Sequence, residues 1–95
     1  MFNQLKQNNM SNKEVIKSFI QGKSTKSSNG NLWVSCDGKR LFNYYTCIAQ
    51  RTENGYVLNS TKYSNTTSRI QYYLRNMLPK YTEVTNIKIG ANELV

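Results

Sequence analysis

The residues best suited to chemistry gather in one segment, Lys62-Tyr-Ser-Asn-Thr-Thr-Ser-Arg69, in which hydroxyl and amide groups stand between two cations. The segment joins a strand pattern to an amphipathic helix pattern. A helix start needs one such side chain to satisfy an orphan backbone N–H group, and we expect Thr66 or Thr67 in that role. The surplus hydroxyls, the free N–H groups and Arg69 suit an anion such as phosphate. In the plainer interpretation, Ser64 and Asn65 shape the turn and Arg69 is a surface cation.

The outer face of the following helix extends this candidate surface. It carries further cations with an interleaved Tyr and Asn, which suits contacts with phosphates or with a nucleic-acid groove. The cations would neutralise phosphates, and the hydroxyl and phenol groups would fix the register. A charged outer face is also ordinary for a surface helix. The complete set of candidate binding residues is Lys62, Ser64, Thr66, Thr67, Ser68, Arg69, Tyr72, Arg75, Asn76 and Lys80.

A second candidate site is one face of the sheet expected over residues 31–61. Trp33 and Phe42 are expected as cross-strand partners, with Arg40 and Tyr44 on the same face. Basic, aromatic sheet faces stack the bases of RNA or single-stranded DNA. The alternative is a packed core, because two amphipathic helices are available and each could cover one face.

The composition argues against catalysis and against a metal or cofactor. The chain has no His, which removes the usual general base and the usual metal ligand. Its five carboxylates are scattered along the sequence. Cys36 and Cys47 are too few for a zinc site without His. The expected strand register places them on the order of 25 Å apart, as buried free thiols. We therefore expect a non-catalytic protein without a cofactor.

Charge and length set the class of partner. The chain of 95 residues predicts one domain, and its formal net charge of +8 favours a polyanion: nucleic acid, an acidic protein surface or anionic lipid. Solubility or a Lys-rich codon bias is the alternative explanation of the charge. No apolar run is long enough to cross a membrane, and the N-terminus lacks a signal-peptide core, so a cytoplasmic protein is expected. The oligomeric state stays open.

Helical signals occur twice. Ser11 and Glu14 form a capping box, and Gly22 stands where a helix would end, which predicts a helix over 12–21 after a flexible leader, 1–10. A polar connector follows over 23–30. The second helix is predicted to end at Leu78 before Pro79. Its apolar stripe consists of Ile70, Tyr73, Leu74, Met77 and Leu78.

Between the helices the pattern predicts strands. Asp37-Gly38 and Asn54-Gly55 are strong hairpin signals, which predict a three-stranded antiparallel meander over 31–36, 39–52 and 56–61. Two-residue turns pair Val34 with Leu41, and Arg51 with Leu58. A short last strand is expected within 81–89. The predicted fold is therefore α+β, with a single domain over 11–90 and a frayed tail over 91–95.

The chain resembles a family of small uncharacterised proteins from phages, plasmids and their Gram-positive bacterial hosts. The resemblance covers residues 30–78 and lies in a Tyr-x-Thr-x-Ile-Ala strand and a Tyr-Ser-x-Thr-Thr-Ser-Arg junction. The family often has a His after the Arg, where this chain has Ile70. The resemblance implies a mobile-element origin in a bacterial host cell and no particular activity. The matching positions are Tyr44, Thr46, Ile48, Ala49, Tyr63, Ser64, Thr66, Thr67, Ser68 and Arg69.

These observations together predict a small basic protein of phage or mobile-element origin that binds DNA or RNA through the second helix. The alternative is an anti-CRISPR-like inhibitor of host defence, which would bind an acidic or nucleic-acid-binding host protein. A less favoured third interpretation is a small-nucleotide binder at the start of the second helix.

Overall fold

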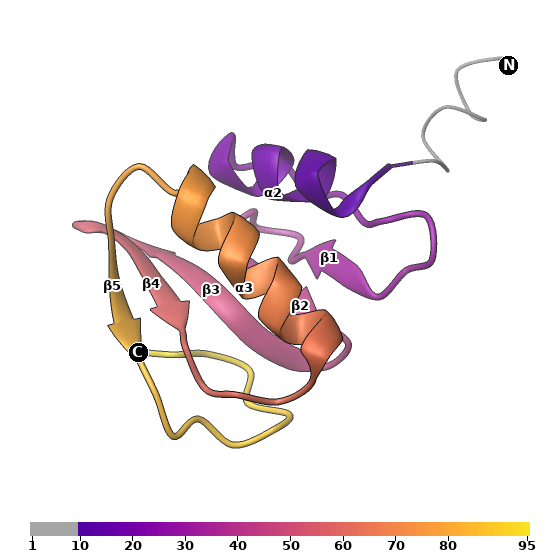
Figure 1. Cartoon of the computed structure of the whole chain (residues 1–95). Coiled ribbons are helices and arrows are strands. Elements are labelled where there is room, and N and C mark those ends of the chain that lie inside the picture. Colours follow the sequence, from indigo (N-terminus) through magenta and orange to yellow (C-terminus); the bar gives the residue numbers. More distant parts are fainter. Residues whose placement is uncertain (1–9) are drawn as a thin grey trace, which may run out of the picture.

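The computed structural model describes residues 10–95, so residues 1–9 of the predicted leader lie outside it. Within these described residues, two helices and a five-stranded sheet confirm the α+β class (Figure 1). The elements in order are α2 (Asn12–Ile20), β1 (Leu32–Val34), β2 (Arg40–Asn43), β3 (Thr46–Thr52), β4 (Gly55–Asn59), α3 (Asn65–Met77) and β5 (Tyr81–Val84).

The sheet has the order β1-β2-β3-β4-β5. Strands β1 to β4 form an antiparallel meander, as the hairpin signals predict, although it has one strand more than expected. The fifth strand is parallel to β4. A parallel neighbour requires a crossover connection, and α3 supplies it. The last strand is shorter than the predicted range 81–89, because it ends at Val84.

The predicted strand 39–52 is two strands. Asn43 pairs with Thr46, so Tyr44 and Tyr45 form a tight turn between β2 and β3. Tyr44 has φ +57°, a left-handed conformation that a bulky residue rarely adopts. Two-residue hairpin turns normally carry Gly, Asn or Asp there, so a Tyr-Tyr pair gives no turn signal. The sequence prediction of one continuous strand is therefore wrong.

The strand registers match the prediction for the first hairpin and differ for the last. Val34 pairs with Leu41 as predicted. Arg51 pairs with Tyr56 instead of Leu58, because the tight turn is Glu53-Asn54. The two-residue slip leaves the side chains of β4 on their predicted faces, since side chains alternate with a period of two.

A β-bulge between β2 and β3 changes the fate of the cysteines. Leu41 pairs with Ala49 but Phe42 pairs with Cys47, so Ile48 is the extra residue. Cys47 therefore moves to the face opposite the one predicted. Both thiols are free, and Cys47 is buried, as expected. The prediction for Cys36 is wrong, because that residue is exposed.

Helix α2 begins with the predicted capping box, in which the Ser11 hydroxyl accepts the Glu14 N–H and the Glu14 side chain accepts the Ser11 N–H. At its other end, the Arg51 guanidinium donates to the carbonyls of Phe19 and Ile20 at 2.8 and 2.9 Å. These bonds satisfy carbonyls that have no partner inside the helix. Helix α2 is thereby fixed to β3.

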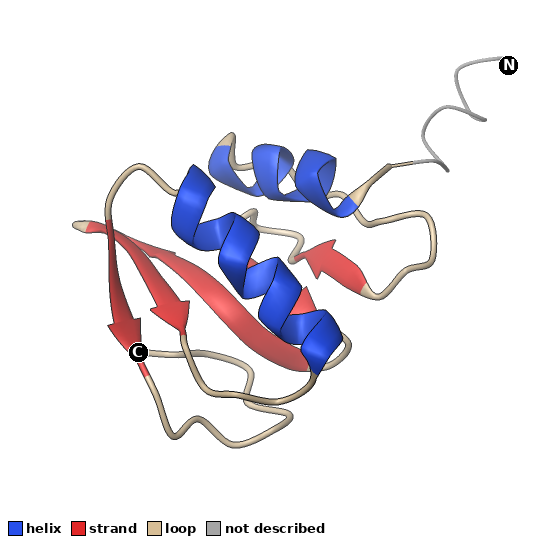
Figure 2. Ribbon diagram, viewed as in Figure 1, coloured by secondary structure: helices blue, strands red, loops and turns tan. Residues whose placement is uncertain are grey.

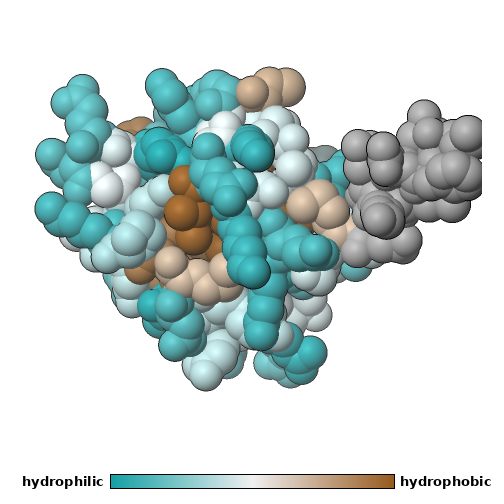
Figure 3. All heavy atoms as spheres, turned by 90° about the horizontal axis from the view of Figure 1, so that it is seen from above, coloured by the Kyte–Doolittle hydropathy of each residue, from teal (hydrophilic) through white to brown (hydrophobic). Residues whose placement is uncertain are grey.

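Both helices lie on the same face of the sheet (Figure 2). The expectation that each helix could cover a separate face is wrong. Viewed from above Figure 1, the surface is mainly hydrophilic with a small hydrophobic area near its centre (Figure 3). The buried cluster between helices and sheet consists of Val15, Ile16, Phe19, Leu32, Val34, Leu41, Ile48, Ala49, Tyr56, Leu58, Ile70, Leu74 and Leu78.

The C-terminal segment binds the sheet away from the helices. The Ala91 carbonyl accepts the Cys47 N–H at 2.8 Å. Arg40 donates to the Asn92 carbonyl, and the Leu94 N–H donates to the Gln50 side chain. Strand alternation places Arg40 and Gln50 on the face opposite the core residues. The end expected to fray, 91–95, is therefore hydrogen-bonded to that face.

Candidate functional site

The start of α3 is capped by Ser64, and the prediction of Thr66 or Thr67 as the cap is wrong. The Ser64 hydroxyl accepts the Thr67 N–H at 3.2 Å. Thr66 is exposed, whereas Thr67 is buried. The junction therefore uses its hydroxyls differently from the prediction.

A chain of side-chain hydrogen bonds ties this helix start to β2. The Thr67 hydroxyl donates to the Asn43 Oδ1 at 2.6 Å and lies 3.1 Å from the Ser64 hydroxyl. Because a hydroxyl carries one proton and that of Thr67 is committed to Asn43, Ser64 is the donor in the second bond. Asn43 in turn donates to the Asn31 carbonyl. Folding thus accounts for Ser64 and Thr67, two of the hydroxyls that suggested a binding site.

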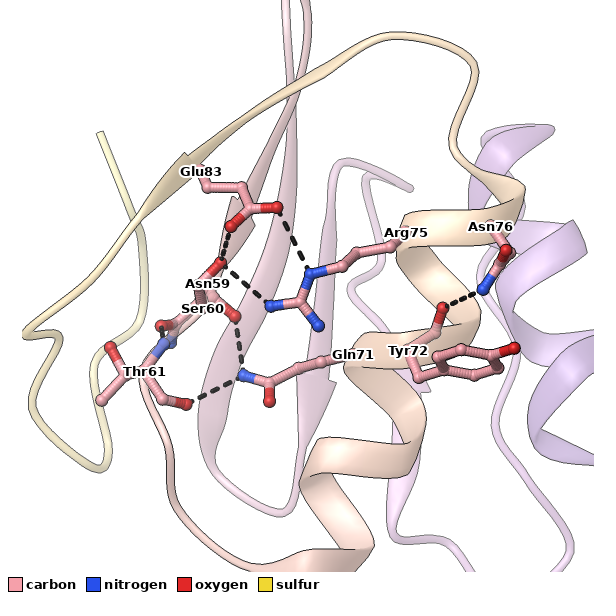
Figure 4. A network of polar contacts seen from close by, with 8 residues as sticks. All are labelled: Asn59, Ser60, Thr61, Gln71, Tyr72, Arg75, Asn76 and Glu83. Carbon is pink, nitrogen blue, oxygen red and sulfur yellow. Dashed lines mark hydrogen bonds and ion pairs between the residues drawn. The ribbon is translucent and has the colours of Figure 1, made fainter.

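A second polar network anchors α3 to the end of β4, and it involves residues that the sequence reasoning missed. Gln71, buried within the helix face, donates to the carbonyls of Asn59 and Thr61 at 2.7 and 2.9 Å (Figure 4). Asn59 is fully buried and donates to the Cys47 carbonyl and to the Tyr63 hydroxyl. Buried amides of this kind satisfy carbonyls where a strand stops pairing. No periodicity in the sequence marks them.

The predicted basic surface on α3 is divided by internal contacts. Arg75 points to Glu83 of β5, with 3.3 Å between Nε and Oε2, and its guanidinium also donates to the Ser60 hydroxyl (Figure 4). The hydrogen bond from Ser60, and next the Arg75 guanidinium, hold the pKa of Glu83 below its usual value. Asn76 donates back to the Tyr72 carbonyl. The side chains of Arg75 and Asn76 are therefore engaged in contacts within the protein.

The remaining candidates on α3 do not form one continuous patch. Lys62, Arg69 and the exposed Thr66 lie near the helix start, with the partly exposed Ser68. Lys80 follows the helix end and is separated from them by the length of α3. Tyr72 lies between, 62% exposed. The start of the helix is therefore the part of the predicted surface that keeps free cations.

The sheet-face candidates are also separated. Trp33 and Phe42 are cross-strand partners, as predicted, and stack with ring centroids 4.3 Å apart and planes within 9°. Phe42 is only 5% exposed, and Arg40 is bound to the C-terminal segment. They do not offer an open stacking surface. Tyr44 lies apart from them, in the turn, where its carbonyl accepts the Trp33 Nε1–H at 2.8 Å.

The structure brings Tyr44 together with the helix start at one pocket of about 680 Å³. This volume lies within the range of about 300–1,000 Å³ that is typical of ligand pockets. Three segments meet there: the β2–β3 turn, the β4–α3 junction and the chain after β5. The lining residues are Asn43, Tyr44, Tyr45, Thr46, Ile48, Lys62, Tyr63, Ser64, Thr67, Ile89 and Gly90.

The pocket wall is aromatic and apolar, and its charge is positive. Tyr45 and Ile89 are 80% and 77% exposed, and Tyr44 is 49% exposed. Lys62 is the cation among the lining residues, which include no carboxylate. The first turn of α3 holds no acidic residue. Within residues 10–95, the N–H groups of Asn65 and Thr66 have no hydrogen-bond partner, as expected for a helix start.

The topology separates this pocket from the turns that contain Asp37 and Glu53. In an antiparallel meander, successive turns lie at opposite ends of the sheet. The β2–β3 turn therefore lies opposite the β1–β2 and β3–β4 turns, which contain Asp37 and Glu53. The Ser35 hydroxyl, and next the Lys39 N–H, hold the pKa of Asp37 below its usual value, so its carboxyl stays charged. Lys39 and Lys80 also lie at that end. The pocket end carries Lys62, Arg69 and Lys88.

Metal-ligating groups and one buried thiol were the remaining candidates for chemistry among the described residues. No group of three or more metal-ligating side chains occurs in residues 10–95. Burial raises the pKa of the Cys47 thiol to about 11, which keeps it protonated and unreactive.

None of the helices in residues 10–95 is long and apolar enough to cross a membrane. Comparisons with protein-family models, with curated proteins and with solved structures found no match to the chain.

Proposed function

We propose that this chain is a small, non-catalytic protein that binds nucleic acid through the basic end of the molecule, where α3 begins. The observation that carries the proposal is the group of exposed cations at this end. Lys62 and Arg69 stand exposed at the helix start, and Lys88 lies in the chain that returns to it. The lining of the adjacent pocket contains no carboxylate.

The physical basis is neutralisation of phosphates at a helix start. Lys62 and Arg69 supply full charges, and the free N–H groups of Asn65 and Thr66 supply the positive end of the helix dipole. No acidic side chain in the first turn of α3 competes with a phosphate for these groups. Such contacts are independent of sequence and weaken steeply with salt.

The proposal also includes the origin of the protein and its place in the cell. A phage or mobile-element origin and a place in the cytoplasm of a bacterial host fit a protein that meets nucleic acid directly. Lys80, at the far end of α3, is left outside the proposed contact surface. Arg75 is left outside it too, because Glu83 and Ser60 already engage its guanidinium.

A matched pair of lysine variants tests the proposal. Lys62 and Lys39 are both exposed, but Lys39 lies in the β1–β2 turn at the opposite end. The binding of a labelled oligonucleotide is measured by fluorescence polarisation at several salt concentrations. We expect Lys62→Ala to weaken binding and to lower the slope of log K against log salt by about 0.7–0.9. Lys39→Ala is expected to leave the slope unchanged.

Two results would contradict the proposal. One is the absence of binding to any DNA or RNA at low salt. The other is an equal loss for both lysine variants, which would mean that only the total charge matters. Capture of a bacterial host protein that survives nuclease treatment, together with the first result, would favour the host-defence inhibitor instead.

A further inference from the structure

We infer that the pocket beside α3 holds an unpaired nucleobase, so that the nucleic acid bound at this end is single-stranded. The inference rests on the proposed function and adds to it the class of strand and the place of the base. It is carried by a strained turn, by the wall of the pocket and by the position of the cations.

The backbone strain at Tyr44 is the first step. This residue holds φ +57°, where a non-glycine residue costs about 1–3 kcal/mol. Three contacts keep it there. Its N–H donates to the Asn31 carbonyl at 2.7 Å, its carbonyl accepts the Trp33 indole N–H, and its hydroxyl lies 3.4 Å from the Asn31 amide.

The strained turn places no aromatic ring of Tyr44 or Tyr45 in the buried core. Both tyrosines of the turn are exposed, so neither ring contributes to the core. An Asn or Gly would make the same turn more easily. The aromatic rings at this position are therefore better explained by a ligand than by folding, since strained residues cluster at binding sites.

The wall of the pocket is the second step. Tyr44, Tyr45 and Ile89 present two aromatic rings and one apolar side chain around a space of about 680 Å³. Every nucleobase has a flat π-face that stacks on such rings, largely without regard to sequence. Two hydroxyls of the pocket lining, those of Ser64 and Thr67, are already paired with each other and with Asn43. This chemistry favours stacking over reading of base edges.

The cations are the third step. Lys62 lines the same pocket as the rings, and the free N–H groups of Asn65 and Thr66 follow it in the chain. A base in the pocket would thus have its phosphates beside the positive groups. In a duplex the base faces are covered by their neighbours, so only an unpaired or extruded base could enter.

The experiment compares a single strand with the same strand made abasic at several positions. Both keep the phosphates, and only one supplies bases. Polarisation measures both dissociation constants for the full chain and for Tyr45→Ser, a change at an exposed position. We expect the full chain to bind the normal strand about 5- to 100-fold more tightly than the abasic strand. Tyr45→Ser should remove most of this preference and leave abasic binding unchanged.

A second variant keeps the test independent of folding. Tyr44→Asn retains a residue that accepts the left-handed turn, so its thermal midpoint should not fall. It should lose the preference for bases as Tyr45→Ser does. If both folded variants keep the full preference, the pocket does not hold a base.

The two proposals fail in distinguishable ways. Equal binding of normal and abasic strands, with the predicted salt slope, would overturn the base pocket and leave phosphate binding intact. The absence of binding to both strands would overturn the proposed function itself. Tighter binding of a matched duplex than of the single strand would also contradict the inference.

Discussion

At the scale of the residue, the junction that first suggested a ligand serves two purposes. Ser64 and Thr67 are used by the fold, because they cap α3 and hold it against Asn43. Lys62 and Thr66 remain exposed, with no role in that chain. Fewer polar groups of the junction are therefore left over from folding than the sequence indicates, and those that are left over are exposed to solvent.

The neighbouring residues Thr66 and Thr67 test which hydroxyls of the junction stabilise the fold. Thr67→Val removes the donor to the Asn43 Oδ1, which is buried, and leaves that oxygen without its partner. We expect a loss of about 1–3 kcal/mol in the free energy of unfolding, measured by urea denaturation. Thr66→Val, at an exposed position, is the control and should change it by less than about 0.5 kcal/mol. Equal effects of the two changes would mean that the hydrogen-bond chain does not hold α3.

At the scale of the element, the C-terminal segment determines what the open face of the sheet exposes. It bonds to β3 through the Cys47 N–H and covers the region of a thiol that is fully buried. Cys36 lies in the β1–β2 turn and is exposed. The two thiols are therefore reporters of two different parts of the fold.

The rates of thiol modification test the segment. With a chromogenic disulfide reagent, we expect one thiol of the native chain to react fast and the other only when the protein opens or unfolds. Cys36→Ser should abolish the fast phase and keep the slow one. Deletion of residues 91–95 should accelerate the slow phase by at least about tenfold. Two fast thiols in the intact chain would contradict the placement of this segment.

Local signals predicted the elements better than they predicted the site. The capping box at Ser11 and the first hairpin register were readable from the sequence, because caps and alternation act over a few residues. The turn at Tyr44 was not, because tertiary hydrogen bonds impose a conformation that tyrosine disfavours. The bulge at Ile48 also escaped prediction, since it shifts one residue without a sequence mark.

The candidate site shows the same division. Lys62, Ser64 and Thr67 were identified from the sequence, and Tyr44 was placed in a separate candidate set. Their meeting at one pocket depends on the β2–β3 turn, which the sequence did not reveal. Ile89 was expected at the end of the last strand and lines the pocket instead. Long-range packing, which periodicity does not encode, assembled these residues.

At the scale of the whole molecule, the meander places different segments at its two ends. The turns that contain Asp37 and Glu53 lie at one end, and the strained tyrosine turn, the start of α3 and the chain after β5 meet at the other. Lys62, Arg69 and Lys88 give this second end the positive groups that a polyanion needs. The central claim is that nucleic acid meets the protein there.

A backbone amide NMR titration of the 11.0 kDa chain with a short single-stranded oligonucleotide tests this claim most directly. We expect the shifted amides to cluster in residues 43–48, 62–69 and 87–90, the three segments that surround the pocket. Amides of the β1–β2 and β3–β4 turns should stay in place. Shifts concentrated in those two turns, or no shifts at a saturating oligonucleotide concentration, would contradict this claim.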